Sequence, residues 1–187
     1  MRKHSVLRLS TAALLIAVGI IIPMFSPVKI LLEPASFTLA SHVAIFIAMF
    51  ISPAIAAAVT VGTTVGFFLA GFPIVVVLRA ASHLVFAVLG AFYLQKAPQV
   101  CQSAVKLRVF SFVMGLVHAL CEVLVVSVFY FGGDMVAMYY QQGFYQSVLL
   151  LVGLGTVVHS MVDFEIANLV VVALRKLRVF QQLLHKA

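Results

Sequence analysis

Six apolar stretches follow one another along the chain, and each is about as long as a helix that crosses a membrane. The predicted spans cover residues 9–25, 37–51, 54–70, 74–96 and 109–131, and a last segment that ends at Leu174. About 20 apolar residues cross the hydrocarbon core of a bilayer as a helix. We therefore predict an all-α integral membrane protein, with six transmembrane helices in a single domain over residues 1–187.

Composition supports this class and leaves no room for a soluble catalytic domain. Of the 187 residues, 64% are hydrophobic and only 9% are charged, and the mean hydropathy is +1.21. Soluble domains carry about 25% charged residues. The two cysteines, Cys101 and Cys121, match no metal or redox spacing, so no disulfide and no cofactor is predicted from them.

The connections between the spans differ in character. Residues 26–36 contain two prolines, Lys29 and Glu33, and are predicted to form a loop on the side opposite the N-terminus. Residues 132–146 are rich in glycine and aromatic residues and predict a partly structured loop. The apolar pattern that follows is too long for one ordinary span, so the last helix either tilts or begins near Gly153 or Gly155.

Basic residues predict the orientation in the membrane. With six spans, ten of the twelve lysines and arginines lie on one side, namely Arg2, Lys3, Arg8, Lys96, Lys106, Arg108, Arg175, Lys176, Arg178 and Lys186. Cytoplasmic segments carry such an excess, so both termini are predicted in the cytoplasm of a multi-pass protein of the cell membrane. The net charge of +7 is then a signal of topology and not of nucleic-acid binding.

A few ionisable side chains fall inside the predicted spans, where they are costly unless they face a cavity or a partner. Three pairs are spaced four residues apart, which places both members on one helix face. The candidate substrate-binding residues are His42, Arg79, His83, His118, Glu122, His159 and Asp163. Depth estimates from the helical rise let these groups converge on a pocket that opens outward. Glu165 points to another face and is left out of the site.

Each candidate also has a purely structural explanation. A membrane histidine such as His42 can hydrogen-bond to a neighbouring helix, and Arg79 can extend to the outer surface. Two pairs of small residues predict close helix packing, Ala13 with Ala17 on the first span and Gly62 with Gly66 on the third. The number of histidines and acids together favours a binding site over packing alone.

These features resemble the substrate-binding S component of an energy-coupling factor (ECF) vitamin transporter. The resemblance covers essentially the whole chain and depends on six helices, cytoplasmic termini, the Ala13–Ala17 pair, the long first outer loop and the intramembrane polar groups. The segments ASFTLASHVAIF and FPIVVVLRAASH are similar to members assigned to small vitamins or precursors with a pyridine or pyrimidine ring.

The resemblance implies a division of labour. The S component captures the vitamin from outside, and a transmembrane T component and two cytoplasmic ATPases supply the energy. The chain itself has no phosphate-binding Gly-xxxx-Gly-Lys-Ser/Thr loop. By the same resemblance, Ala13 and Ala17 face the T component, and residues 26–36 help to cover the bound vitamin.

Acids outnumber bases in the candidate site, which favours hydroxymethylpyrimidine or a pyridoxine-like compound, with niacin next. Glu122 and Asp163 can accept hydrogen bonds from an amino group or a protonated ring nitrogen, whereas Arg79 suits a carboxylate.

An alternative is a permease subunit for nickel, cobalt or zinc that uses His42, His83, His118 and Glu122. An intramembrane metalloenzyme is a further alternative, but the chain has no His-Glu-xx-His motif. A purely structural membrane subunit is the third possibility.

Overall fold

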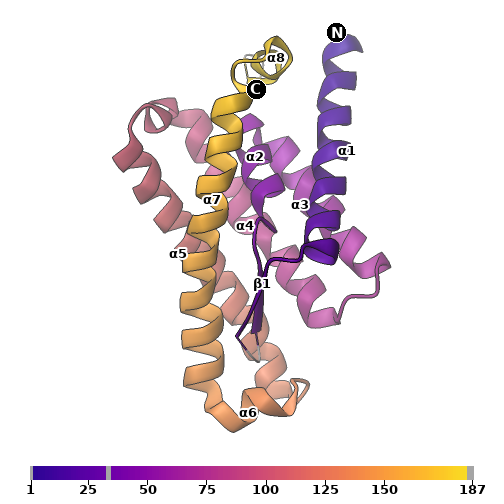
Figure 1. The fold of residues 1–187 in the computed structure, drawn as a ribbon, viewed down its shortest axis with the longest axis vertical. Coiled ribbons are helices and arrows are strands. Elements are labelled where there is room, and N and C mark those ends of the chain that lie inside the picture. The colour runs from indigo at the N-terminus through magenta and orange to yellow at the C-terminus, as the bar shows by residue number, and fades with distance from the viewer. Residues whose placement is uncertain (1, 33–34, 185–187) are drawn as a thin grey trace.

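Helices form most of the chain, because long apolar runs without internal charge satisfy their backbone groups most simply in this way. The computed structural model describes residues 2–32 and 35–184 (Figure 1). The elements are α1 (Arg2–Phe25), β1 (Lys29–Leu32), β2 (Ala35–Thr38), α2 (Val43–Ile51), α3 (Pro53–Leu69), α4 (Ile74–Lys96), the 3₁₀ helix η1 (Pro98–Gln102), α5 (Ala104–Gly132), α6 (Ala137–Phe144), the π-helix η2 (Tyr145–Leu154), α7 (Gly155–Leu174) and α8 (Arg178–Leu184).

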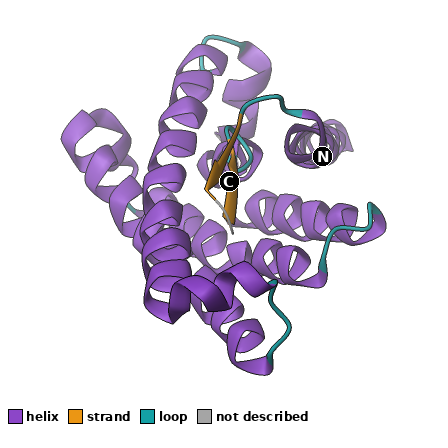
Figure 2. Ribbon diagram, turned by 60° about the horizontal axis from the view of Figure 1, so that its bottom comes forward, coloured by secondary structure: helices purple, strands orange, loops and turns teal. Residues whose placement is uncertain are grey.

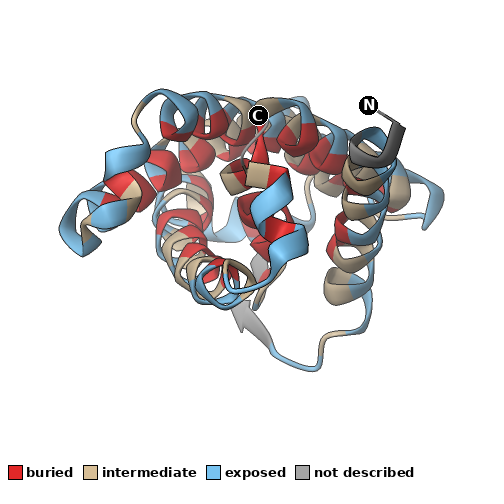
Figure 3. Cartoon of the chain, turned by 90° about the horizontal axis from the view of Figure 1, so that it is seen from above, coloured by how far each residue is buried: buried red, intermediate tan, exposed pale blue. Residues whose placement is uncertain are grey.

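The short helix α2 lies at the centre of the bundle. Eight of its nine residues are buried, and it packs against α1, α3, α4 and α7. Ser52 ends α2 and begins α3, because its hydroxyl accepts a hydrogen bond from the amide of Ile55 and Pro53 occupies the first turn. Buried residues line the inner faces of the surrounding helices, and exposed residues lie outside (Figure 3).

The predicted second span over residues 37–51 is wrong in its first part. Phe37 belongs to strand β2, and the chain then turns through Ala40, whose φ is +67°, before α2 begins at Val43. The backbone amides of Ala40 and His42 donate to the Asp163 carboxylate at 2.7 and 2.9 Å, which holds the turn and prevents an earlier helix start. At about 1.5 Å per residue, α2 is under half as long as the bilayer core is thick.

The predicted loop over residues 26–36 instead contains most of an antiparallel hairpin. Strands β1 and β2 pair with Lys29 opposite Thr38 and Ile30 opposite Phe37. The hairpin lies among the helices, in the half of the molecule away from the two termini (Figures 1 and 2). Prolines mark the connection, but pairing between its two arms has no local signal in the sequence. Glu33 lies outside the described residues.

Two helical elements that the sequence did not predict precede the last helix. Helix α6 occupies part of the predicted loop over residues 132–146, and the α-helix α7 begins at Gly155, one of the two predicted starts, but the π-helix η2 leads into it without a break. The break lies at Gly143, whose φ of +77° and ψ of +162° are not helical. Helix α5 begins earlier than predicted, at Ala104 and not near Val109, because Ser103 caps it through the amide of Lys106.

Four helical segments in the described part of the chain are long and apolar enough to cross a membrane. They are Ser5–Phe25, Ile74–Lys96, Ala104–Gly132 and Ala137–Leu174, and α3 is a shorter apolar helix. The count of six spans therefore stays a prediction. The start of α1 and helix α8 lie at the same end of the molecule (Figure 1), and whether this end is cytoplasmic also stays a prediction.

The two small-residue pairs lie in different surroundings. Gly62 and Gly66 let α3 approach α1 closely, since a Cβ at Gly62 would lie 2.5 Å from the Cδ1 of Ile16. This confirms the predicted close packing at the glycines. Ala13 and Ala17 are exposed, on the face of α1 that points away from the bundle.

Candidate functional site

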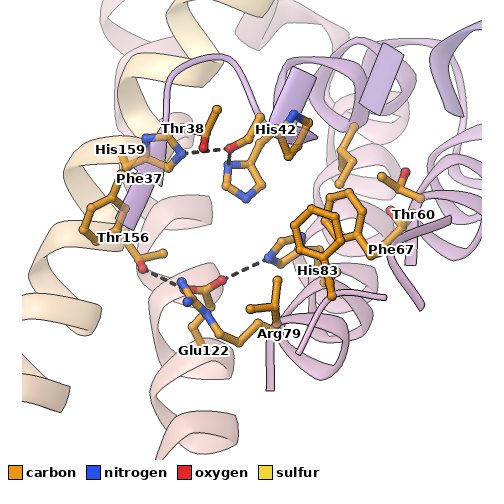
Figure 4. Close-up of a pocket in the computed structure, with 17 residues that line it drawn as sticks. Phe37, Thr38, His42, Thr60, Phe67, Arg79, His83, Glu122, Thr156 and His159 are labelled. Atoms are coloured by element: carbon orange, nitrogen blue, oxygen red, sulfur yellow. Dashed lines mark hydrogen bonds and ion pairs between the residues drawn. The ribbon is translucent and has the colours of Figure 1, made fainter. Parts of the chain in front are cut away.

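A cavity of about 280 Å³ lies between the hairpin and helices α1, α2, α3, α4, α5 and α7. Its polar side chains face one another across the space from several elements (Figure 4). The lining residues are Pro23, Phe37, Thr38, Ser41, His42, Ile45, Thr60, Thr63, Phe67, Phe72, Val76, Arg79, Ala80, His83, Glu122, Thr156 and His159.

Glu122 of α5 holds one side of the cavity together. Its Oε2 accepts hydrogen bonds from Arg79 Nη2 at 2.7 Å and from Thr156 Oγ1 at 2.9 Å. His83 Nε2 lies 3.1 Å from Oε1. Arg79 and His83 are four residues apart on α4, so one helix face presents both to the same carboxylate. A buried carboxylate is tolerated because it has this many partners.

Asp163 of α7 is the second buried carboxylate and lies behind the cavity wall. Besides the two backbone amides of the turn, its Oδ2 lies 3.1 Å from His42 Nδ1 and 3.3 Å from His159 Nε2. Ser41 Oγ connects the same group, at 3.0 Å from His159 Nε2. Asp163 therefore positions His42 and the turn before α2, and it does not face the cavity itself.

His118 of α5 is fully buried beneath these groups. Its Nδ1 lies 3.3 Å from Ser160 Oγ, and its Nε2 lies 3.5 Å from Glu122 Oε1 without forming a hydrogen bond. Ring centroids of His42, His83 and His118 are 4.6 to 4.8 Å apart in edge-to-face contacts. His159 is 5.1 Å from His42. The four imidazoles thus form one connected cluster at the cavity.

Aromatic rings form the apolar walls. Phe37 contacts the ring of His159 at a centroid distance of 5.4 Å, and Phe67 stacks on Phe72 at 4.8 Å. Apolar walls with a few placed polar groups are typical of small-molecule sites, which commonly measure about 300–1,000 Å³. At this small volume, the cavity suits a compact flat ring with one polar substituent.

The structure brings all seven candidate residues into one connected group. His42, Arg79, His83, Glu122 and His159 line the cavity, whereas His118 and Asp163 lie behind it. Glu165 lies apart from this group, as expected, since its Oε1 is 3.6 Å from the Nε of the largely exposed Arg108.

Sequence reasoning missed the hydroxyl partners. Ser41 links His42 to His159, Thr156 donates to Glu122, and Ser160 contacts His118. A signal existed for two of them, because Thr156 and Ser160 share a face of α7 with Asp163 at helical spacing. Ser41 precedes α2 in an irregular turn, so helical periodicity gives no indication of it.

Comparison with known proteins places these features in a family. No protein-family model and no solved structure matches the chain. The niacin transporter NiaX of Lactococcus lactis subsp. cremoris (strain MG1363) is 45% identical over 167 residues, which are 89% of this chain and 73% of that protein. With its long apolar helices, the chain is a multi-pass protein of the plasma membrane and not an enzyme. At this identity and coverage, the chain belongs to the substrate-binding S components of energy-coupling factor vitamin transporters, in the group that contains this relative.

Proposed function

We propose that this S component binds niacin in the cavity and presents it for ATP-driven uptake. The observation that carries the proposal is a small cavity, lined by histidines and phenylalanines, in a chain 45% identical to a niacin transporter. Niacin is a flat pyridine ring with one carboxylate. The aromatic walls suit the ring, and the polar face around His42 and Arg79 suits the carboxylate.

The sequence favours hydroxymethylpyrimidine or pyridoxine over niacin only through the number of acidic side chains among the candidate site residues. In the structure both acids already have partners, since Glu122 accepts from Arg79 and Thr156, and Asp163 accepts from two backbone amides. Neither carboxylate is left to select an amino group on a ligand. The acid count therefore no longer favours those two vitamins, and niacin comes first.

The proposed complex also contains a T component and two cytoplasmic ATPases. The exposed Ala13 and Ala17 offer a small-residue surface on α1 against which a membrane helix can pack closely. The β-hairpin contributes Phe37 and Thr38 to the cavity lining and is proposed to cover the bound vitamin. Transport of a metal ion as cargo is not proposed, because the relative is a vitamin transporter.

Binding of four ligands to the purified protein tests the proposal. Isothermal titration calorimetry should give nicotinate the lowest dissociation constant, at least tenfold below those of nicotinamide, pyridoxine and hydroxymethylpyrimidine. A tenfold difference corresponds to about 1.4 kcal/mol, which one well-placed charged contact can supply. Tighter binding of hydroxymethylpyrimidine than of nicotinate would favour hydroxymethylpyrimidine as the substrate. No binding of any of the four ligands would contradict the proposal.

A further inference from the structure

Three histidines at the base of the cavity form a cluster with the chemistry of a metal site. One ring nitrogen from each of His42, His83 and His118 lies within 4.8 Å of the other two. The residues come from the turn before α2, from α4 and from α5, and each is at most 9% exposed. Neutral imidazole is a ligand for zinc, nickel and copper ions.

One nitrogen of each ring contacts a side chain outside the three histidines. His42 Nδ1 lies 3.1 Å from Asp163, His83 Nε2 lies 3.1 Å from Glu122, and His118 Nδ1 lies 3.3 Å from Ser160. Histidines that bind metals nearly always make such a contact, because it fixes the ring and its tautomer. In His118 the buried Nε2 forms no hydrogen bond in the described structure and lies 3.5 Å from Glu122 Oε1.

Charge in the cluster also favours a cation. Its buried carboxylates are Glu122 and Asp163, whereas Arg79 is its permanently charged base, so the described cluster is left with one excess negative charge when the histidines are neutral. Uncompensated charge inside a membrane protein is costly. A bound divalent ion reverses the sign of this excess charge.

We propose that His42, His83 and His118 bind one divalent transition-metal ion, with zinc as the best fit. Zinc takes three protein ligands at about 2.0–2.1 Å and leaves a fourth position open in sites that bind a small molecule. His42 and His83 line the cavity, so the open position faces it. These bond lengths require the three nitrogens to lie closer together than 4.8 Å, so small side-chain shifts would accompany metal binding. The niacin carboxylate is the fourth ligand, an assignment that rests on the proposed function.

Equilibrium dialysis of tag-free, metal-stripped protein against Zn²⁺ tests the site without any vitamin. Wild type should bind one zinc ion per chain, and His118→Gln and His83→Gln should each lose it while eluting as folded protein in size exclusion. His159→Gln is the matched control and should retain zinc, because His159 belongs to a different group with His42 and Asp163. Failure of wild type to bind zinc, or loss of zinc in His159→Gln with retention in His118→Gln, overturns the assignment.

Nicotinate titration of zinc-loaded and chelator-treated wild type tests the link to the ligand. Chelation should raise the nicotinate dissociation constant at least tenfold. Equal affinity in both forms, with zinc bound in the first, overturns carboxylate coordination and leaves the proposed function standing. Stoichiometric zinc without nicotinate binding contradicts niacin as the ligand and leaves the metal site standing.

Discussion

Glu122 is the residue on which the polar side of the cavity depends most. Three side chains from α4 and α7 meet its carboxylate within 3.1 Å, and the carboxylate is almost fully buried. Removing one partner from a buried ion pair is far more costly than removing an exposed one, because the remaining charge has neither water nor a counter-ion.

We expect Glu122→Gln to destabilise the protein by about 3 kcal/mol, because the largely buried charge of Arg79 then lacks its partner. The matched control is Glu165→Gln, whose ion pair with Arg108 is largely exposed, so its effect should stay below about 1 kcal/mol. Reversible unfolding in mixed detergent micelles measures both. Similar losses for the two variants would show that Glu122 is not the central partner.

The sequence predicted which ionisable residues lie together but not how they are paired. Spacing of four places Arg79 with His83, yet both turn to Glu122 on another helix. Asp163 has a role that periodicity cannot indicate, since it binds backbone amides of a turn more than 120 residues away in sequence. Such partners depend on tertiary packing, which local patterns do not encode.

At the scale of elements, the contact between the hairpin and α7 shapes the cavity. Phe37 of β2 packs directly over Gly155, where a Cβ would lie 2.6 Å from the ring atom Cζ. Only a residue without a side chain allows this approach. Phe37 in turn contacts His159 and lines the cavity, so its position affects the site.

We expect Gly155→Ala to displace Phe37 and weaken nicotinate binding about three- to tenfold, a cost near 1 kcal/mol that is typical of overpacking. Gly153→Ala is the control, because its added methyl group would meet Val123 at 3.3 Å, away from the cavity lining. Calorimetric titration of both variants measures the difference. Equal affinity in Gly155→Ala and wild type would argue against a role for this contact.

Long elements were predictable, whereas the short ones were not. Helices α3 and α4 begin and end within a residue of their predicted bounds, because turn residues mark both ends. The start of α2 and the hairpin escaped prediction, since the apolar run after Phe37 is interrupted only by a turn that Asp163 stabilises. Gly143 and not the later glycines breaks the last segment, and composition gives no means to choose among them.

At the scale of the whole molecule, α1 presents an apolar face that the other described residues do not cover. Leu14 and Ile21 are 64% and 54% exposed on this helix, beside the exposed Ala13 and Ala17. The opposite face packs on α3 through Ile16 and Ile20. Lipid can cover such a surface, but the two alanines also leave room for the backbone of a second helix.

We expect Ala13→Phe combined with Ala17→Phe to abolish co-purification of the proposed T component and reduce niacin uptake by cells more than tenfold. The bulky rings prevent close helix approach, whereas the cavity lies elsewhere, so nicotinate binding by the isolated protein should be unchanged. Ala173→Phe, an exposed alanine on α7, serves as the matched control and should retain both uptake and co-purification. Full uptake by the double variant would mean that the surface that contacts the T component lies on another helix.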